Sequence, residues 1–180
     1  MPAQLSRISS RPCRATTLST SAAHSDSRVT SSASKRAPGI AAAAASPSGA
    51  FATLVAARLQ PDGEVELCTA GHTSPLLVAA SGITELPADG MPIGLFCDAP
   101  FATRRLHLAP GDALLLFTDG LTESTSADGV ELGSHGVRAA LAAISWQTPA
   151  ELVRAASAAA IGHHRHDDLT VLAVARRSAN

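Results

Sequence analysis

The chain has 180 residues, of which 46% are hydrophobic and 16% are charged, and its formal net charge is −1. This length and composition suit one globular domain and exclude a large multidomain enzyme. Aromatic residues make up only 3% of the chain, so stacking surfaces for single-stranded nucleic acid are not expected.

Residues 1–50 differ in composition from the rest of the chain. They contain six basic residues and one acidic residue, whereas residues 51–180 contain eight basic and fourteen acidic residues. The first segment is rich in Ser, Ala, Thr and Arg, and it has too few large aliphatic side chains to offset chain entropy by burial. We predict a disordered basic leader at 1–50 or an incorrectly assigned start of the reading frame, with an organellar transit peptide as the alternative. The folded domain is predicted at 51–180.

The segment from residue 51 to residue 117 predicts five or six antiparallel strands, because apolar runs and alternating patterns are separated by turn residues. Paired in chain order, the expected strands are 51–59 with 64–70, 75–80 with 83–86, and 101–108 with 113–117. The turns between these partners contain Pro61-Asp62-Gly63, Ser81-Gly82 and Pro110-Gly111.

Two helices and a final strand are predicted in the last third of the chain. Residues 137–144 space apolar side chains three and four apart, as one face of a helix does. A second helix is predicted over 149–161, where Thr148 as N-cap and Glu151 form a capping box. The apolar run 169–175 is typical of a buried strand. This order of elements indicates an α+β domain with helices packed on a sheet.

Several familiar motifs are missing from the sequence. It contains no GxxxxGK[ST], GxGxxG, HExxH or GxSxG pattern, which removes the most common nucleotide-binding, zinc-protease and serine-hydrolase interpretations. Cys13, Cys68 and Cys97 lack CxxC spacing, and they predict reduced thiols in a cytoplasmic protein. No apolar run approaches the roughly 20 residues that a membrane-spanning helix needs.

Two carboxylate positions stand at the ends of predicted strands. Asp119 directly follows the apolar run LLLFT, and Asp167-Asp168 precede the final strand. Adjacent acids repel one another unless they are solvated or neutralised, and carboxylate oxygens suit Mg²⁺ or Mn²⁺. If the two strands are neighbours, these acids converge on one hard-cation site. A tight turn at Asp119-Gly120 and solvated loop acids at 167–168 are the alternative interpretation.

A His-rich tract, GHHRHDD, includes the second pair of acids. Its imidazoles, those of His163, His164 and His166, suit Zn²⁺, Ni²⁺ or Cu²⁺. Local His-rich tracts can also bind such ions without a physiological purpose, and this interpretation is favoured over a dedicated transition-metal site. Nucleic-acid binding by the leader rests only on six dispersed basic residues and is not favoured.

Five motifs follow one another along residues 51–180. They are FATL at 51–54, AGHTSPLL at 70–77, GMPIGL at 90–95, the LxPGDxLLLxTDGLTE block at 108–123 and DDLTVLAV at 167–174. In this order they resemble the C-terminal two thirds of the SpoIIE-type phosphatase domain, a bacterial branch of the PPM (PP2C-like) metal-dependent protein serine/threonine phosphatases. The resemblance implies a PPM/PP2C-like αββα sandwich, incomplete at its N-terminal side, with two Mn²⁺ or Mg²⁺ ions at one edge of its sheets.

The resemblance also implies roles for individual residues. Asp119 of the TDG motif and Asp167 of the closing motif are the implied catalytic and metal-binding carboxylates, and Gly120 shares in the metal site through its backbone. The implied supporting residues are Thr118, His72 and Asp168. In such a site a metal-activated water attacks the phosphorus of phosphoserine or phosphothreonine directly.

One motif of the family has no counterpart in this sequence. The family's GDxxGxG segment, whose Asp and Gly bridge both metals, matches nothing in residues 1–50, so at least one ion is expected to bind weakly or not at all. The favoured function is a cytoplasmic phosphatase in signal transduction, which dephosphorylates a small regulatory protein of the anti-sigma-factor antagonist type. The alternative is a noncatalytic, truncated phosphatase-like binding module. Neither nucleic acid nor a membrane is an expected partner, whereas uncovered sheet surface favours a homodimer.

Overall fold

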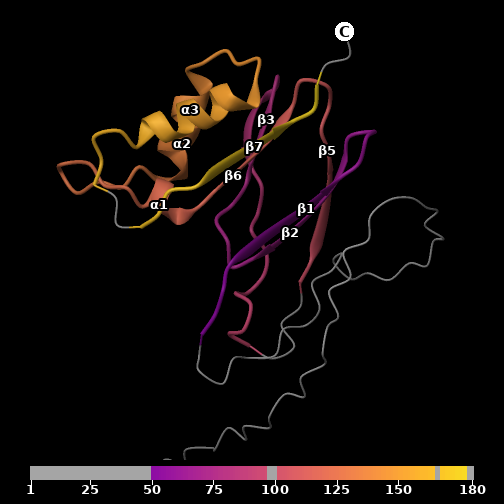
Figure 1. Ribbon diagram of the computed structural model, residues 1–180, viewed down its shortest axis with the longest axis horizontal. Helices are drawn as coiled ribbons and strands as arrows, with labels where there is room; N and C mark the ends of the chain where they lie inside the picture. The colour runs from indigo at the N-terminus through magenta and orange to yellow at the C-terminus, as the bar shows by residue number, and fades with distance from the viewer. Residues whose placement is uncertain (1–49, 97–100, 165–166, 178–180) are drawn as a thin grey trace, which may run out of the picture.

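The computed structural model describes residues 50–96, 101–164 and 167–177 of the protein (Figure 1). Its strands are β1 (Leu54–Leu59), β2 (Glu64–Ala70), β3 (Leu76–Ala79), β4 (Gly82–Glu85), β5 (Thr103–His107), β6 (Ala113–Phe117) and β7 (Val171–Ala175). Its helices are α1 (Asp119–Thr122), α2 (Gly133–Ala142) and α3 (Pro149–Ala159). The predicted leader, apart from residue 50, lies outside the described residues, as do Cys13, Cys97 and His166.

Two antiparallel sheets are present in the described ranges. One has the strand order β1-β2-β5 and the other β4-β3-β6-β7. β1 pairs with β2 across the Pro61-Asp62-Gly63 turn, and β3 pairs with β4 across Ala80-Ser81. The first two predicted hairpins are therefore confirmed.

The third predicted strand pair is wrong. β5 and β6 are both strands, but β5 pairs with β2, whereas β6 pairs with β3 and β7. The turn at Pro110-Gly111 therefore carries the chain from one sheet to the other. The residues explain this placement, because ALLLF in β6 is apolar on both faces and fits a central strand. β5 instead carries Arg104 and Arg105, whose charged ends stay in solvent at the edge of the smaller sheet.

β6 contributes to two separate cores. Its residues at odd positions, among them Leu115 and Phe117, pack with buried side chains of β3 and all three helices. Leu114 and Leu116 point the other way and pack between the two sheets with Leu67 of β2. The described residues thus form three layers in the order helix, sheet, sheet, and Figure 1 shows α2 and α3 together on one side of the larger sheet. The predicted α+β class is confirmed.

The two long helices occupy the predicted regions. α3 begins at Pro149 as predicted, and its first turn contains the predicted capping box. α2 begins at Gly133, four residues before the predicted start, because apolar spacing reveals only its buried face around Val137 and Leu141. Within the described ranges no helix combines the length and the apolar character needed to cross a membrane.

The capping box yields a prediction about pH. The N–H groups of Gln147 and Thr148 donate to the Glu151 carboxylate at 2.7 and 3.1 Å, and these bonds hold the Glu151 pKa below its ordinary value of 4.5. Glu151→Gln keeps an acceptor oxygen but removes the charge, so we expect a lower free energy of unfolding at neutral pH. The advantage of Glu151 is fully present above pH 4.5 and disappears as the pH falls through the folded-state pKa.

Urea unfolding of both proteins from about pH 7 to about pH 3 measures this difference. A difference in the free energy of unfolding that stays constant across this range would contradict the proposed role of the carboxylate charge.

Candidate functional site

The ends of β6 and β7 bring the two predicted carboxylate positions together. These strands are antiparallel neighbours, and Phe117 at the end of β6 lies opposite Val171 at the start of β7. Asp119, the first residue of α1, and Asp167, shortly before β7, therefore lie at one edge of the larger sheet. The two strands are thus neighbours, which was the condition for these acids to lie near one another.

Thr118 joins the two segments at this edge by three hydrogen bonds. Its N–H donates to the Thr170 carbonyl at 3.0 Å. Its hydroxyl donates to the Asp168 carbonyl and accepts from the Thr170 N–H, both at 2.9 Å. Thr118 thus fixes the segment that carries Asp119 against the segment that carries Asp167.

Gly120 is buried against the backbone of the other segment. A Cβ at this position would lie 2.5 Å from the Asp168 carbonyl oxygen and 3.0 Å from that of Asp167, so only glycine fits without a backbone shift. The Gly120 N–H also donates to Asp119 Oδ1 at 2.9 Å. In the same way the Asp168 N–H donates to Asp167 Oδ1 at 2.7 Å. Each predicted metal-binding carboxylate is therefore oriented by the backbone of the residue that follows it.

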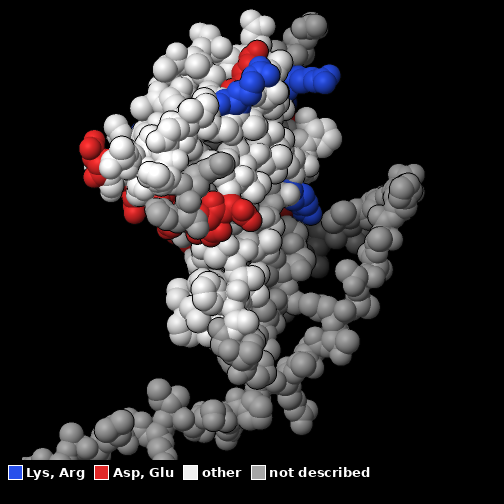
Figure 2. Space-filling view, turned by 60° about the vertical axis from the view of Figure 1, so that its left-hand side comes forward, with Lys and Arg blue, Asp and Glu red and all other residues white. Residues whose placement is uncertain are grey.

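The edge carries a concentration of negative charge. Four exposed acidic residues belong to the segments that meet there, namely Asp119, Glu123, Asp167 and Asp168. Figure 2 shows a group of acidic side chains on the side of the molecule that bears α1, apart from the Lys and Arg side chains in view. Neighbouring carboxylates repel one another, and a bound cation relieves that repulsion.

The donor atoms at this edge suit a hard divalent cation. Asp119 and Asp167 offer carboxylate oxygens, which Mg²⁺ and Mn²⁺ prefer, and the backbone contact at Gly120 holds their segments together. Asp119 and Asp167 therefore fit one side of such a site. Among the described residues no group of three or more His, Cys, Asp or Glu side chains could hold a metal ion, so these two acids by themselves are not a complete two-ion centre.

His72 is connected to the same edge through its neighbour. His72 Nδ1 lies 3.0 Å from the Thr73 hydroxyl oxygen, and that hydroxyl donates to the Phe117 carbonyl at the end of β6. The loop that carries His72 is thereby fastened to the strand that leads to Asp119. Thr73 was not among the residues predicted from the sequence, where its only signal is its place in the AGHTSPLL motif.

The His-rich tract is tied to a different segment. His164 exchanges two backbone hydrogen bonds with Thr125, at 2.7 and 2.9 Å. His163 is half-buried, and its Nδ1 has no hydrogen-bond partner within the described part of the chain. The third imidazole of the tract, His166, lies outside that part.

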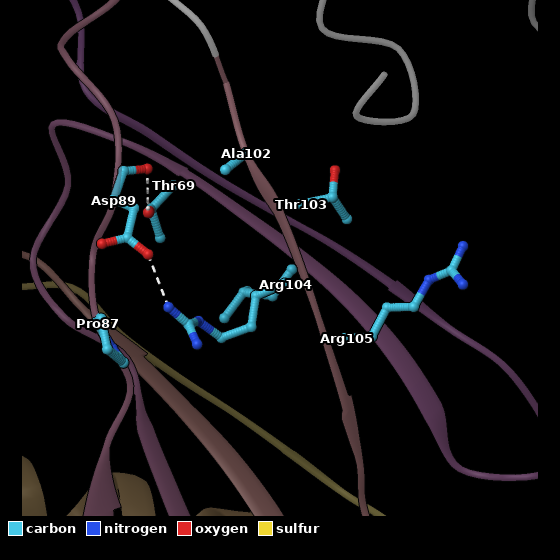
Figure 3. Close-up of a pocket in the computed structure, with 8 residues that line it drawn as sticks. Thr69, Pro87, Asp89, Ala102, Thr103, Arg104 and Arg105 are labelled. Atoms are coloured by element: carbon cyan, nitrogen blue, oxygen red, sulfur yellow. Dashed lines mark hydrogen bonds and ion pairs between the residues drawn. The ribbon is translucent and has the colours of Figure 1, made fainter. Parts of the chain in front are cut away.

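A separate cavity of about 340 Å³ lies between β2, β5 and the segment around Asp89 (Figure 3). Arg104 donates to Asp89 Oδ2 at 2.7 Å, and the Thr69 hydroxyl donates to the Asp89 carbonyl at 3.1 Å. Figure 3 shows Arg105 directed away from Asp89, and this second arginine pairs with Glu66. Arg104 is thus paired inside the cavity and Arg105 is paired with Glu66 outside its lining, and neither predicted carboxylate position lines it, so the cavity is not the candidate active site.

The contact at Gly120 predicts a specific effect of substitution. We expect Gly120→Ala to lower the free energy of unfolding by about 1–3 kcal/mol, because the added methyl group forces two backbone segments apart. Gly136→Ala in α2 is the matched control, since the nearest atoms that its Cβ would meet outside the helix backbone belong to the Leu132 side chain, which can move, and alanine favours a helix. Urea unfolding of both variants measures the difference. Equal effects of the two substitutions would show that the Gly120 contact is not tight.

One known protein family matches most of this chain. The model of the family Stage II sporulation protein E (SpoIIE) matches residues 15–177. The match begins inside the segment predicted as a leader. Among individual proteins, Protein IcfG from Synechocystis is 27% identical over 120 residues, which are 64% of this chain and 19% of that protein.

Solved structures share the fold. The phosphatase domain of the cell fate determinant SpoIIE from Bacillus subtilis is 20% identical with a TM-score of 0.58, and the match covers 72% of this chain and 58% of that one. The RsbU and RsbW domains of Rv1364c from Mycobacterium tuberculosis are 30% identical with a TM-score of 0.59, over 71% of this chain and 38% of that one. The chain thus spans less than two thirds of the length of each relative, and the predicted PP2C-like fold is confirmed.

Proposed function

This chain belongs to the SpoIIE family, and we propose that it is a metal-dependent protein serine/threonine phosphatase. The observation that carries the proposal is the meeting of Asp119 and Asp167 at the common edge of β6 and β7. The close backbone contact at Gly120 and the hydrogen bonds of Thr118 support it, since both hold the two acids in place. Family membership supports phosphatase chemistry in general.

Asp119 and Asp167 would hold Mn²⁺ or Mg²⁺ through their carboxylate oxygens, and a bound ion would activate water for attack on a phosphate ester. The N–H groups of Gly120 and Asp168 each occupy Oδ1 of one of these acids, which leaves the second oxygen for a ligand. Both acids are exposed, so a phosphoserine on the surface of a folded protein can reach them. Without a cation the acidic edge repels a phosphate group, so activity should require the added metal.

The proposed substrate is a phosphorylated regulatory protein of the anti-sigma-factor antagonist type, encountered in the cytoplasm. The resemblance of the five motifs supports this choice. The domain boundary near residue 50 is part of the same proposal, since β1 begins at Leu54. A homodimer is a further expectation of the resemblance.

A noncatalytic binding module is the second candidate function. It is favoured by one observation, that the described residues offer no group of three or more metal-ligating side chains. Two carboxylates neutralise only part of the charge of two divalent ions. In this case the chain would bind a phosphoprotein or a single ion without turnover.

The deciding measurement is hydrolysis of a phosphoserine peptide and of an aryl phosphate by the purified 180-residue chain, with and without Mn²⁺. We expect activity that Mn²⁺ restores after chelation. Asp119→Asn and Asp167→Asn should each lower it by about 100-fold or more, because losing even an outer partner of a metal ligand costs 10–100-fold. Asp128→Asn changes an exposed acid in another Asp-Gly turn and should leave the rate unchanged.

The outcomes separate the two candidates. A folded chain that binds Mn²⁺ through Asp119 without hydrolysing either substrate would support the binding module. Equal activity of wild type and the Asp119 variant would refute both the catalytic proposal and the assigned metal site.

A further inference from the structure

β4 is the outermost strand of the larger sheet, and its far edge has no strand beside it among the described residues. The hydrogen-bond pattern of the hairpin shows which groups face that edge. Leu86 N–H donates to the Pro75 carbonyl at 2.8 Å, and hydrogen-bonded pairs alternate along an antiparallel ladder. In the register of β3 and β4 the backbone N–H and C=O groups of Ile83 and Glu85 therefore point outward.

An apolar groove adjoins this hairpin on the helix-covered face of the sheet. It has a volume of about 520 Å³ and lies between the β3–β4 turn and the second half of α2. Val78 and Ile83 line it from the hairpin, and Leu141, Ile144 and Trp146 line it from the helix and the residues that follow it. A side chain of an added strand could enter this groove beside β4.

The two ionisable side chains that line the groove are both basic. His135 and Arg138 of α2 line it, and no carboxylate does. Arg138 is exposed and takes part in no ion pair within the described ranges. Arg138 is thus an unneutralised cation at the rim of an apolar groove, which favours a partner that carries a carboxylate there.

The groove lies at the opposite end of the sheet from the candidate active site. Val78 of β3 is paired with Ala113 at the start of β6, whereas Asp119 follows the last residue of that strand. A segment bound at the groove would therefore leave the acidic edge accessible.

We propose that β4 and this groove dock an extended segment of a partner protein in which apolar and acidic residues alternate. The segment adds a strand to β4 through the free backbone groups of Ile83 and Glu85. Its apolar side chains enter the groove, and an acidic side chain pairs with Arg138. Backbone hydrogen bonds give such an interaction its affinity, and the pockets for alternate side chains give it specificity.

A second copy of this chain fits the surface less well. β4 has only four residues, and two strands of that length bury little of the roughly 1,200 Å² that a stable interface needs. In a symmetric pair the same basic side chains of both copies would also face the shared interface.

The single tryptophan makes the proposal testable. Trp146 lines the groove, and the chain contains one Trp and no Tyr, so intrinsic fluorescence reports on this site alone. The probes are two capped eight-residue peptides, one that alternates Val with Glu and one that alternates Val with Lys. We expect the Val-Glu peptide to shift Trp146 emission to the blue in a saturable titration, and the Val-Lys peptide to bind at least about tenfold more weakly.

Two pairs of variants test the charge and the strand edge. Arg138→Glu should reverse the preference between the peptides, whereas Arg177→Glu, which changes an exposed arginine outside the groove, should keep it. Glu85→Pro removes an outward N–H and should weaken binding at least about tenfold, because proline blocks strand addition at an edge. Glu85→Ala keeps that N–H and should bind the Val-Glu peptide at least as tightly as wild type.

Three results would overturn the proposal. The first is the absence of a saturable change with either peptide, and the second is equal binding of the two peptides by wild type. The third is a free chain that sediments as a dimer and becomes a monomer in Glu85→Pro, since β4 would then be occupied by a second copy.

Discussion

The pairing of β6 with β7 is the constraint on which both the fold and the candidate site depend. β6 is buried on both faces, between the helices and the smaller sheet, and close-packed interiors resist displacement of such a strand. β7 is registered against it along its whole length, from Ala113 to Phe117. Because packing in the two cores holds β6 and β7 in place, it also determines where the acids that follow β6 and precede β7 lie at the surface.

Two contacts at that edge hold the segment that carries Asp119 against the segment that carries Asp167. Thr118 bonds to backbone groups of the opposite segment, and Gly120 brings its backbone against the same segment because it has no Cβ. Both contacts use backbone atoms of residues 167–170, so the carboxylates of Asp119 and Asp167 stay exposed. The arrangement stabilises the fold while it leaves the oxygens that could take a cation in reach of solvent.

The two ends of the larger sheet differ in charge. The end that carries α1 presents carboxylates, whereas the groove beside the β3–β4 turn is apolar and lined by His135 and Arg138. An acidic partner segment would be repelled at the first end and attracted at the second. The surface proposed for catalysis and the surface proposed for docking therefore differ in charge as well as in position.

The sequence by itself determined the features that have local signals. Thr148 and Glu151 marked the start of α3, the Pro61-Asp62-Gly63 turn and the alternation after it marked a hairpin, and the order of five motifs indicated the family. Strand partners had no such signal. Pro110-Gly111 predicts a turn whichever strand follows it, so only the tertiary structure showed that this turn joins two sheets.

The acids at 119 and 167 were also recognisable one by one. Their placement at one edge depended on contacts between residues 50 positions apart, such as Thr118 with Asp168, and these contacts exist only when β7 is paired with β6 in the folded core.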